Sequence, residues 1–212
     1  MPNKRRTRII GAAARRKIME TKKQFSTRKL VLIALFTAIV VVLQYLGAFI
    51  RFGPFSISLV LMPIVVGAAL TGVFSGGWLG IVFGLIVLIS GDAAAFMAIS
   101  PLAAIVIVML KGALAGLAAG AAYKLLEKKS KMLAVIIAAA VCPIVNTGIF
   151  ALGTYIFFMP TITEWGTAAG FASGAAFLFI GMIGMNFVIE LAINIILSPV
   201  IVRLVQFGQG GK

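Results

Sequence analysis

Long apolar stretches dominate the chain, and charged residues interrupt them at only a few points. A helix that crosses a bilayer needs roughly 17–25 mostly apolar residues. Four stretches reach this length: residues 30–50, 99–126, 132–158 and 174–204. Two further apolar stretches are shorter: residues 56–70 and 76–90. The turn-forming run TGVFSGG lies between the two short stretches, so the pattern predicts six membrane spans.

Composition agrees with this pattern. Of the 212 residues, 62% are hydrophobic and 11% are charged, and the mean hydropathy is +1.15. About a quarter of the residues in soluble domains are charged, so this chain has too little polar surface for water. We predict an all-α integral membrane protein with a six-helix bundle at residues 30–205. A basic segment at 1–29 precedes the bundle, and a short tail at 206–212 follows it.

The basic residues predict the orientation of the spans. Of the 19 Lys and Arg residues, 11 precede residue 30. Six more lie between the fourth and fifth spans or near the end of the chain: Lys124, Lys128, Lys129, Lys131, Arg203 and Lys212. With six spans these 17 charges fall on one side, and the positive-inside rule places that side and both termini in the cytoplasm.

The basic N-terminal segment allows two interpretations. A net charge of +14 fits a nucleic-acid-binding arm. Basic residues that flank a span also fix its orientation and attract anionic lipid heads. Because the charge belongs to the flank of a span, the second interpretation is favoured. Membrane lipid is therefore an expected partner, and nucleic acid is not.

Several residue types needed for catalysis or metal binding are scarce. The chain has no His, one Cys (Cys142) and five scattered acidic residues. Zinc sites, Cys-His nucleophilic pairs and Asp-rich magnesium sites need groups that the sequence does not supply. A phosphate-binding GxxxxGK[ST] loop is also missing from the sequence. We expect no catalysis, no metal and no cofactor.

Glycines repeat at intervals of four in the third and fourth spans. The first row is Gly72, Gly76, Gly80 and Gly84, and the second is Gly112, Gly116 and Gly120. Small residues at this spacing let helix backbones approach closely in lipid. Packing inside the protein is the favoured explanation, and docking against another membrane protein is the alternative.

Polar residues inside the spans are candidates for a ligand site. Asn186, Glu190 and Asn194 are spaced four apart, so they share one face of the sixth span. Lys111 and Asn186 lie ~18 Å from the outer ends of their spans, and Asn146, beside Thr147, lies ~21 Å from the inner end of its span. All of these positions are near mid-membrane. Intramembrane ionisable groups usually face a cavity or a partner, which indicates a polar pocket.

Two other interpretations of these polar residues remain open. Lys111 and Glu190 form a structural ion pair in the first, while the asparagines bond neighbouring helices. A buried glutamate that titrates near neutrality serves a proton relay in the second. Replacement of Glu190 by Gln separates ligand contact from structure.

The chain resembles the substrate-binding S components of energy-coupling factor (ECF) transporters over roughly residues 28–205. The resemblance is carried by the AxxxA pair Ala34 and Ala38, by RFGPFSIS, by GDAAAF and by the six-span layout. It implies a receptor in the prokaryotic plasma membrane that binds a vitamin or related micronutrient from outside. A T subunit and two ATPase subunits are implied partners for inward delivery.

The resemblance also implies roles for particular residues. Ala34 and Ala38 would form the docking surface for the T subunit. Lys111, Asn146, Asn186 and Glu190 lie on helices that line the pocket in the family. Outer loops at 47–55, 91–98 and 160–173 would close the pocket, with Asp92 and Trp165 contributing from the last two.

Two other function classes are kept as alternatives. A stand-alone ion-coupled secondary transporter needs broken helices or paired carboxylates near the midplane, and an internal repeat. The sequence shows no clear repeat, and only the short second and third spans point in this direction. A membrane scaffold protein has no need of a polar cluster at mid-membrane. ATP-dependent uptake with partner subunits separates the receptor from the secondary transporter, and a tightly held small molecule separates both from a scaffold.

Overall fold

The computed structural model describes residues 27–49, 51–52, 55–56 and 59–208, and this part of the chain is mainly helical. The elements in chain order are α2 (Thr27–Phe49), β1 (Arg51–Phe52), β2 (Phe55–Ser56), α3 (Leu61–Thr71), α4 (Val73–Ile89), α5 (Ala94–Ile99), α6 (Pro101–Leu126), α7 (Lys131–Phe157), α8 (Met159–Ala168), α9 (Gly174–Ala176), the π-helix η1 (Phe177–Gly184), α10 (Met185–Ile196) and α11 (Ser198–Gly208). The predicted basic segment lies outside these residues up to position 26, as does the tail from 209.

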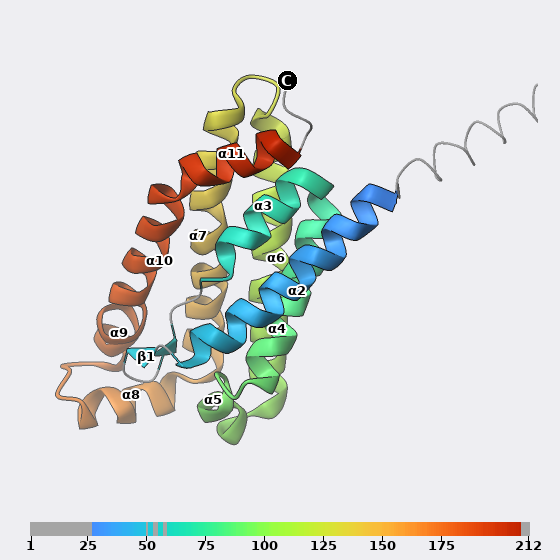
Figure 1. Ribbon diagram of the computed structural model, residues 1–212. Helices are drawn as coiled ribbons and strands as arrows, with labels where there is room; N and C mark the ends of the chain where they lie inside the picture. The colour runs from blue at the N-terminus through green and yellow to red at the C-terminus, as the bar shows by residue number, and fades with distance from the viewer. Residues whose placement is uncertain (1–26, 50, 53–54, 57–58, 209–212) are drawn as a thin grey trace, which may run out of the picture.

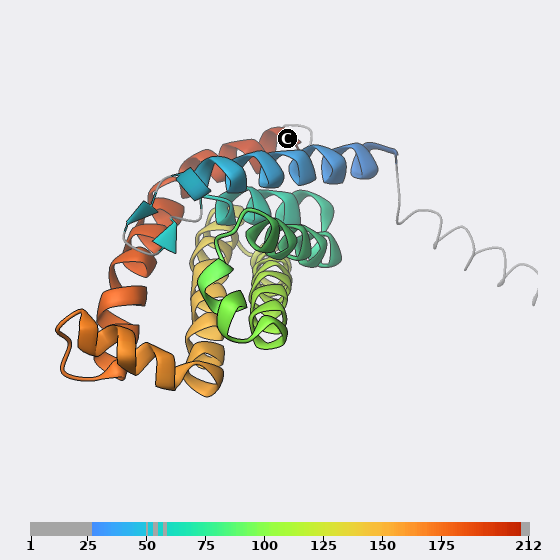
Figure 2. The same ribbon diagram turned by 90° about the horizontal axis from the view of Figure 1, so that it is seen from below.

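The long helices α6 and α7 stand at the centre of the bundle (Figure 1). Helix α4 packs against α6, while α2 and α3 cover one side and the η1–α10 helix stands on the other (Figures 1 and 2). The β1–β2 hairpin, α5 and α8 gather at one end of the bundle. Helix α11 and the α6–α7 connection lie at the opposite end.

Two hydrophobic clusters hold the helices together. The larger one joins α3, α4, α6 and α7, with Leu61, Phe83, Ala115 and Ala138 fully buried. The smaller one lies among α5, α6, α8 and η1, with fully buried Ile162 at its centre. The second cluster fixes the short helices at the hairpin end of the bundle.

Four helices of the described chain are long and apolar enough to cross a membrane. They span Thr27–Gly47, Pro101–Leu126, Lys131–Phe157 and Gly174–Ile196. The 11 residues of α3 rise about 16 Å and the 17 residues of α4 about 25 Å. The hydrocarbon core of a bilayer is about 30 Å thick. The all-helical membrane fold is therefore confirmed, whereas the count of six full spans is not.

The last predicted span ends earlier than expected. The sequence pattern extended it to residue 204, but α10 ends at Ile196 and a separate helix, α11, begins at Ser198. Pro199 has no backbone N–H to continue the hydrogen-bond ladder of α10. The apolar residues that follow therefore form a helix across the end of the bundle (Figure 1).

Two connections that were expected to be outer loops contain helices. Residues 91–98 were expected to form a loop, but α5 begins at Ala94. Most of α8 lies within the expected loop at 160–173. Gly91, with φ of 83°, makes the turn that separates α4 from α5. Helices α5 and α8 thus cover the end of the bundle where the β1–β2 hairpin lies.

The glycine rows of α4 and α6 face each other, which confirms the prediction of internal packing. A Cβ added at Gly80 would overlap the carbonyl oxygen of Gly112, and one at Gly76 would overlap that of Gly116. Gly72 differs from the rest of its row, because it ends α3 with φ of 105° and turns the chain into α4. The α4–α6 contact is thus one in which backbones touch.

Ser130 caps the N-terminus of α7, since its hydroxyl accepts a 3.3 Å hydrogen bond from the Leu133 amide. We expect Ser130→Ala to lower the free energy of unfolding by about 1 kcal/mol, the usual cost of a lost cap. Ser100 occupies the same position in α6 without such a bond, so Ser100→Ala is the matched control. Thermal unfolding in detergent measures both, and equal effects would contradict the capping role.

Candidate functional site

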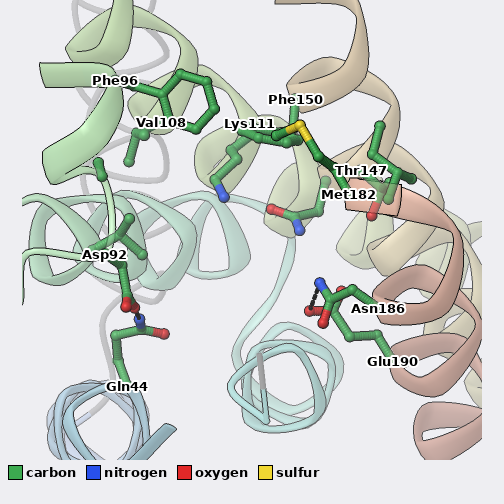
Figure 3. Close-up of a pocket in the computed structure, with 14 residues that line it drawn as sticks. Gln44, Asp92, Phe96, Val108, Lys111, Thr147, Phe150, Met182, Asn186 and Glu190 are labelled. Atoms are coloured by element: carbon green, nitrogen blue, oxygen red, sulfur yellow. Dashed lines mark hydrogen bonds between the residues drawn. The ribbon is translucent and has the colours of Figure 1, made fainter. Parts of the chain in front are cut away.

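A pocket opens among the helices of the bundle, with a cavity of about 90 Å³ that is partly open to solvent. Residues from seven segments of the chain line it (Figure 3): Gln44, Val87, Asp92, Ala93, Phe96, Val108, Lys111, Asn146, Thr147, Phe150, Met182, Ile183, Asn186 and Glu190.

Five of the six predicted site residues line this pocket. They are Asp92, Lys111, Asn146, Asn186 and Glu190. Trp165 is the exception, because its ring packs 5.9 Å from the ring of Phe96 and does not line the pocket. Phe96 also meets Phe150 and Phe158 edge-on, at 5.6 and 5.0 Å. Trp165 therefore contributes to the site by supporting the aromatic wall.

Lys111 reaches the pocket from α6 and lies between two aromatic faces. Its Nζ is 5.2 Å from the centre of the Phe150 ring and 5.6 Å from that of Phe83. At these distances the quadrupole of each ring attracts the ammonium as a cation–π contact. Both Glu190 and Asp92 interact with it electrostatically. Within the described residues, however, the direct ion pair between Lys111 and Glu190 is not formed.

Glu190 and its asparagine neighbours lie on α10, which continues from η1. Asn186 Nδ2 donates to Glu190 Oε1 over 3.2 Å. Asn194 donates to the backbone oxygen of Glu190 over 2.8 Å and does not line the pocket. The three residues predicted to share one helix face therefore differ in position: Asn186 and Glu190 line the pocket, whereas Asn194 is buried and does not line it. Because η1 is a π-helix, it sets the rotation at which these side chains enter the pocket.

Asn146 enters the pocket from α7 and is only 4% exposed. Its Oδ1 has no hydrogen-bond partner in the described part of the protein. A buried polar atom without a partner costs about 1–3 kcal/mol. The pocket wall thus holds an acceptor that a ligand can satisfy.

Gln44 is a pocket residue that the sequence analysis missed. It lies on α2, is 2% exposed, and donates from Nε2 to Asp92 Oδ2 over 2.6 Å (Figure 3). An amide within an otherwise apolar span was the available signal. The apolar wall residues Phe96, Phe150 and Met182 gave no signal, because they resemble any lipid-facing or core residue.

The predicted docking residues lie away from the pocket. Ala34 and Ala38 are both exposed on α2. Val31, Leu35 and Val42 are exposed on the same helix, at 60%, 52% and 55%. Small and large apolar side chains thus alternate along an uncovered helix face.

Comparison with known proteins identifies the family. The model for "ECF transporter, substrate-specific component" matches residues 28–202. The chain belongs to this family. Its fold also matches a solved structure of ThiT from Listeria monocytogenes with a TM-score of 0.58 and 20% sequence identity. That match covers 84% of this chain and 96% of the other. No curated protein sequence matches this chain significantly.

Membership in the ECF substrate-specific family settles the coarse function. The chain is a substrate-binding subunit of an ECF transporter and a membrane protein, and its family is one of transporter components rather than enzymes. The likeness to ThiT shows the shared fold.

Proposed function

We propose that this ECF component captures a vitamin or related micronutrient from outside and delivers it inward. A T subunit and two ATPases act with it in the prokaryotic plasma membrane. The observation that carries the proposal is the pocket in which Lys111, Asn146, Asn186 and Glu190 converge from three helices. Chains of the same family are substrate-specific components.

The distribution of charge supports the direction of transport. Lys124, Lys128, Lys129 and Lys131 lie at or beside the α6–α7 connection. By the positive-inside rule this end faces the cytoplasm, and the end with the hairpin, α5 and α8 faces outward. Asp92 and Phe96, on the segment around α5 at the outward end, belong to the pocket wall. Substrate then enters from outside past α5 and α8.

The uncovered face of α2 supports docking to a T subunit. Ala34 and Ala38 are exposed and have the smallest side chains that still form a helix well. Small residues allow a second membrane helix to approach closely. In this proposal the α2 face binds the T subunit, while Gln44 on the same helix lines the pocket and donates a hydrogen bond to Asp92.

Uptake into vesicles tests the proposal. The chain is reconstituted with and without T and ATPase subunits, and cell extract is supplied as the source of substrate. Mass spectrometry then identifies compounds that accumulate inside. We expect one small molecule to accumulate only with ATP and all subunits present. Accumulation driven by an ion gradient without the ATPases would instead establish a secondary transporter.

Glu190→Gln is expected to weaken substrate binding by about tenfold or more, because this is the loss of affinity expected when a charge-assisted hydrogen bond is removed. The substitution keeps the shape of a side chain that is 2% exposed and removes its charge. Equilibrium binding of the compound found by uptake measures the effect. Glu164→Gln is the control, because Glu164 is exposed on α8. Unchanged affinity with a lowered melting temperature would show that Glu190 is structural.

A further inference from the structure

The Lys111 ammonium brings unused hydrogen-bond donors to the pocket. An ammonium group has three N–H donors and no acceptor. The contacts of Lys111 within the described chain are the faces of Phe83 and Phe150. Neither a hydrogen bond nor an ion pair with a described residue occupies its N–H groups. Such a group, partly buried at mid-membrane, is costly until an acceptor reaches it.

The neighbouring helix supplies an unused acceptor. Asn146 is 4% exposed, lines the same pocket, and its Oδ1 lacks a hydrogen bond within the described residues. Lys111 lies on α6 and Asn146 on α7, and these two helices pack against each other. The pocket therefore presents a cationic donor and a neutral acceptor from adjacent helices.

The two carboxylates of the pocket already have amide donors. Asp92 accepts from Gln44 over 2.6 Å, and Glu190 accepts from Asn186 over 3.2 Å. These bonds hold the carboxylates in place around the cavity. Both carboxylates also interact electrostatically with Lys111. The hydrogen bonds of the ammonium itself remain for a bound molecule.

We propose that the pocket recognises a small carboxylic acid. The carboxylate of the substrate accepts hydrogen bonds from Lys111, and a hydroxyl or amide N–H on the same molecule donates to Asn146. A charge-assisted bond to an ammonium is about twice as strong as a neutral one. The apolar wall of Phe96, Phe150 and Met182 covers the carbon skeleton between these two groups. This inference rests on the proposed function, since it names the chemical class for the same pocket.

The test uses the compound that the protein itself retains. The protein is purified gently, denatured, and the released molecules are identified by mass spectrometry. Methylation of the released compound counts its carboxyl groups, because each one gains a methylene. The free acid and its methyl ester are then bound to protein washed free of the compound. We expect the released compound to be a carboxylic acid present in a stoichiometric amount relative to the protein. We expect its methyl ester to bind roughly 10- to 100-fold more weakly, as the loss of a charged hydrogen bond predicts.

Matched variants assign the effect to Lys111. Lys111→Met keeps a side chain of similar length and removes the charge. We expect it to weaken binding of the acid roughly 10- to 100-fold and to leave the affinity for the ester unchanged. Lys124→Met is the control, because Lys124 is exposed at the far end of the same helix. If Lys111→Met does not fold, the comparison of acid and ester on the native protein still decides.

Each result bears on a different claim. A retained compound without a carboxyl group, or an acid whose ester binds equally well, overturns the carboxylate inference and leaves the proposed function standing. The absence of any retained compound from cells grown in rich medium overturns both. A third outcome is that the native protein binds the acid more tightly than the ester, while Lys111→Met binds the acid as tightly as the native protein does. That outcome assigns carboxylate recognition to another residue and overturns the role of Lys111.

Discussion

Gly80→Ala is expected to destabilise the folded protein by about 3 kcal/mol or more, the upper end of the cost of overpacking. The added Cβ would meet backbone atoms of Gly112 and Ala113 on α6, which cannot rotate away as a side chain does. Helices α4 and α6 must then separate along the whole glycine contact. Thermal unfolding in detergent and the yield of monodisperse protein measure the loss.

Gly148→Ala is the control for this experiment. Gly148 lies on α7, and apart from the adjoining backbone of that helix no heavy atom of the described residues lies within 4 Å of a Cβ added there. Alanine is also favoured over glycine in a helix by roughly 0.8–1.0 kcal/mol. The same substitution should therefore leave stability unchanged or raise it. Equal stability of the two variants would show that α4 and α6 do not touch through their backbones.

Ala38→Trp is expected to abolish uptake while substrate binding stays intact. Ala38 is exposed on α2, and a tryptophan there leaves the folded chain undisturbed but keeps a second helix from approaching. The measurements are ATP-driven accumulation in vesicles that contain all subunits, and equilibrium binding to the isolated chain.

Leu102→Trp provides the comparison for this docking surface. Leu102 lies on α6 and is 75% exposed, so the indole meets lipid rather than the proposed partner. Uptake by this variant should match that of the unmodified protein. Normal uptake by Ala38→Trp would exclude the Ala34 and Ala38 face as the docking surface.

The sequence was informative wherever a residue conflicted with its surroundings. Lys111, Asn146, Asn186 and Glu190 are costly in an apolar span, so their joint presence predicted a pocket before any contact was known. The glycine rows predicted close helix packing for a similar reason, since only small residues allow it. All four polar residues line the pocket, and the glycine rows interlock.

The sequence was less informative about the ends and short pieces of the fold. The run at 174–204 stays mostly apolar past residue 197, although α10 ends at Ile196 and α11 begins at Ser198. α5 and α8 are too short to show a clear period and are fixed by packing of Phe96 and Ile162 in the smaller cluster. Trp165 lies on α8, so its distance from the pocket depended on a helix that was expected to be a loop.

The sequence by itself determined that this protein is a helical membrane protein with polar groups inside its apolar helices, because the hydropathy of each residue can be read without knowing its contacts. Only the tertiary structure decided which of those groups meet. The bond between Gln44 and Asp92 joins residues 48 positions apart, and Lys111 lies over rings from α4 and α7. Such contacts depend on how helices are rotated and tilted against one another, and the packing of the whole bundle sets those angles.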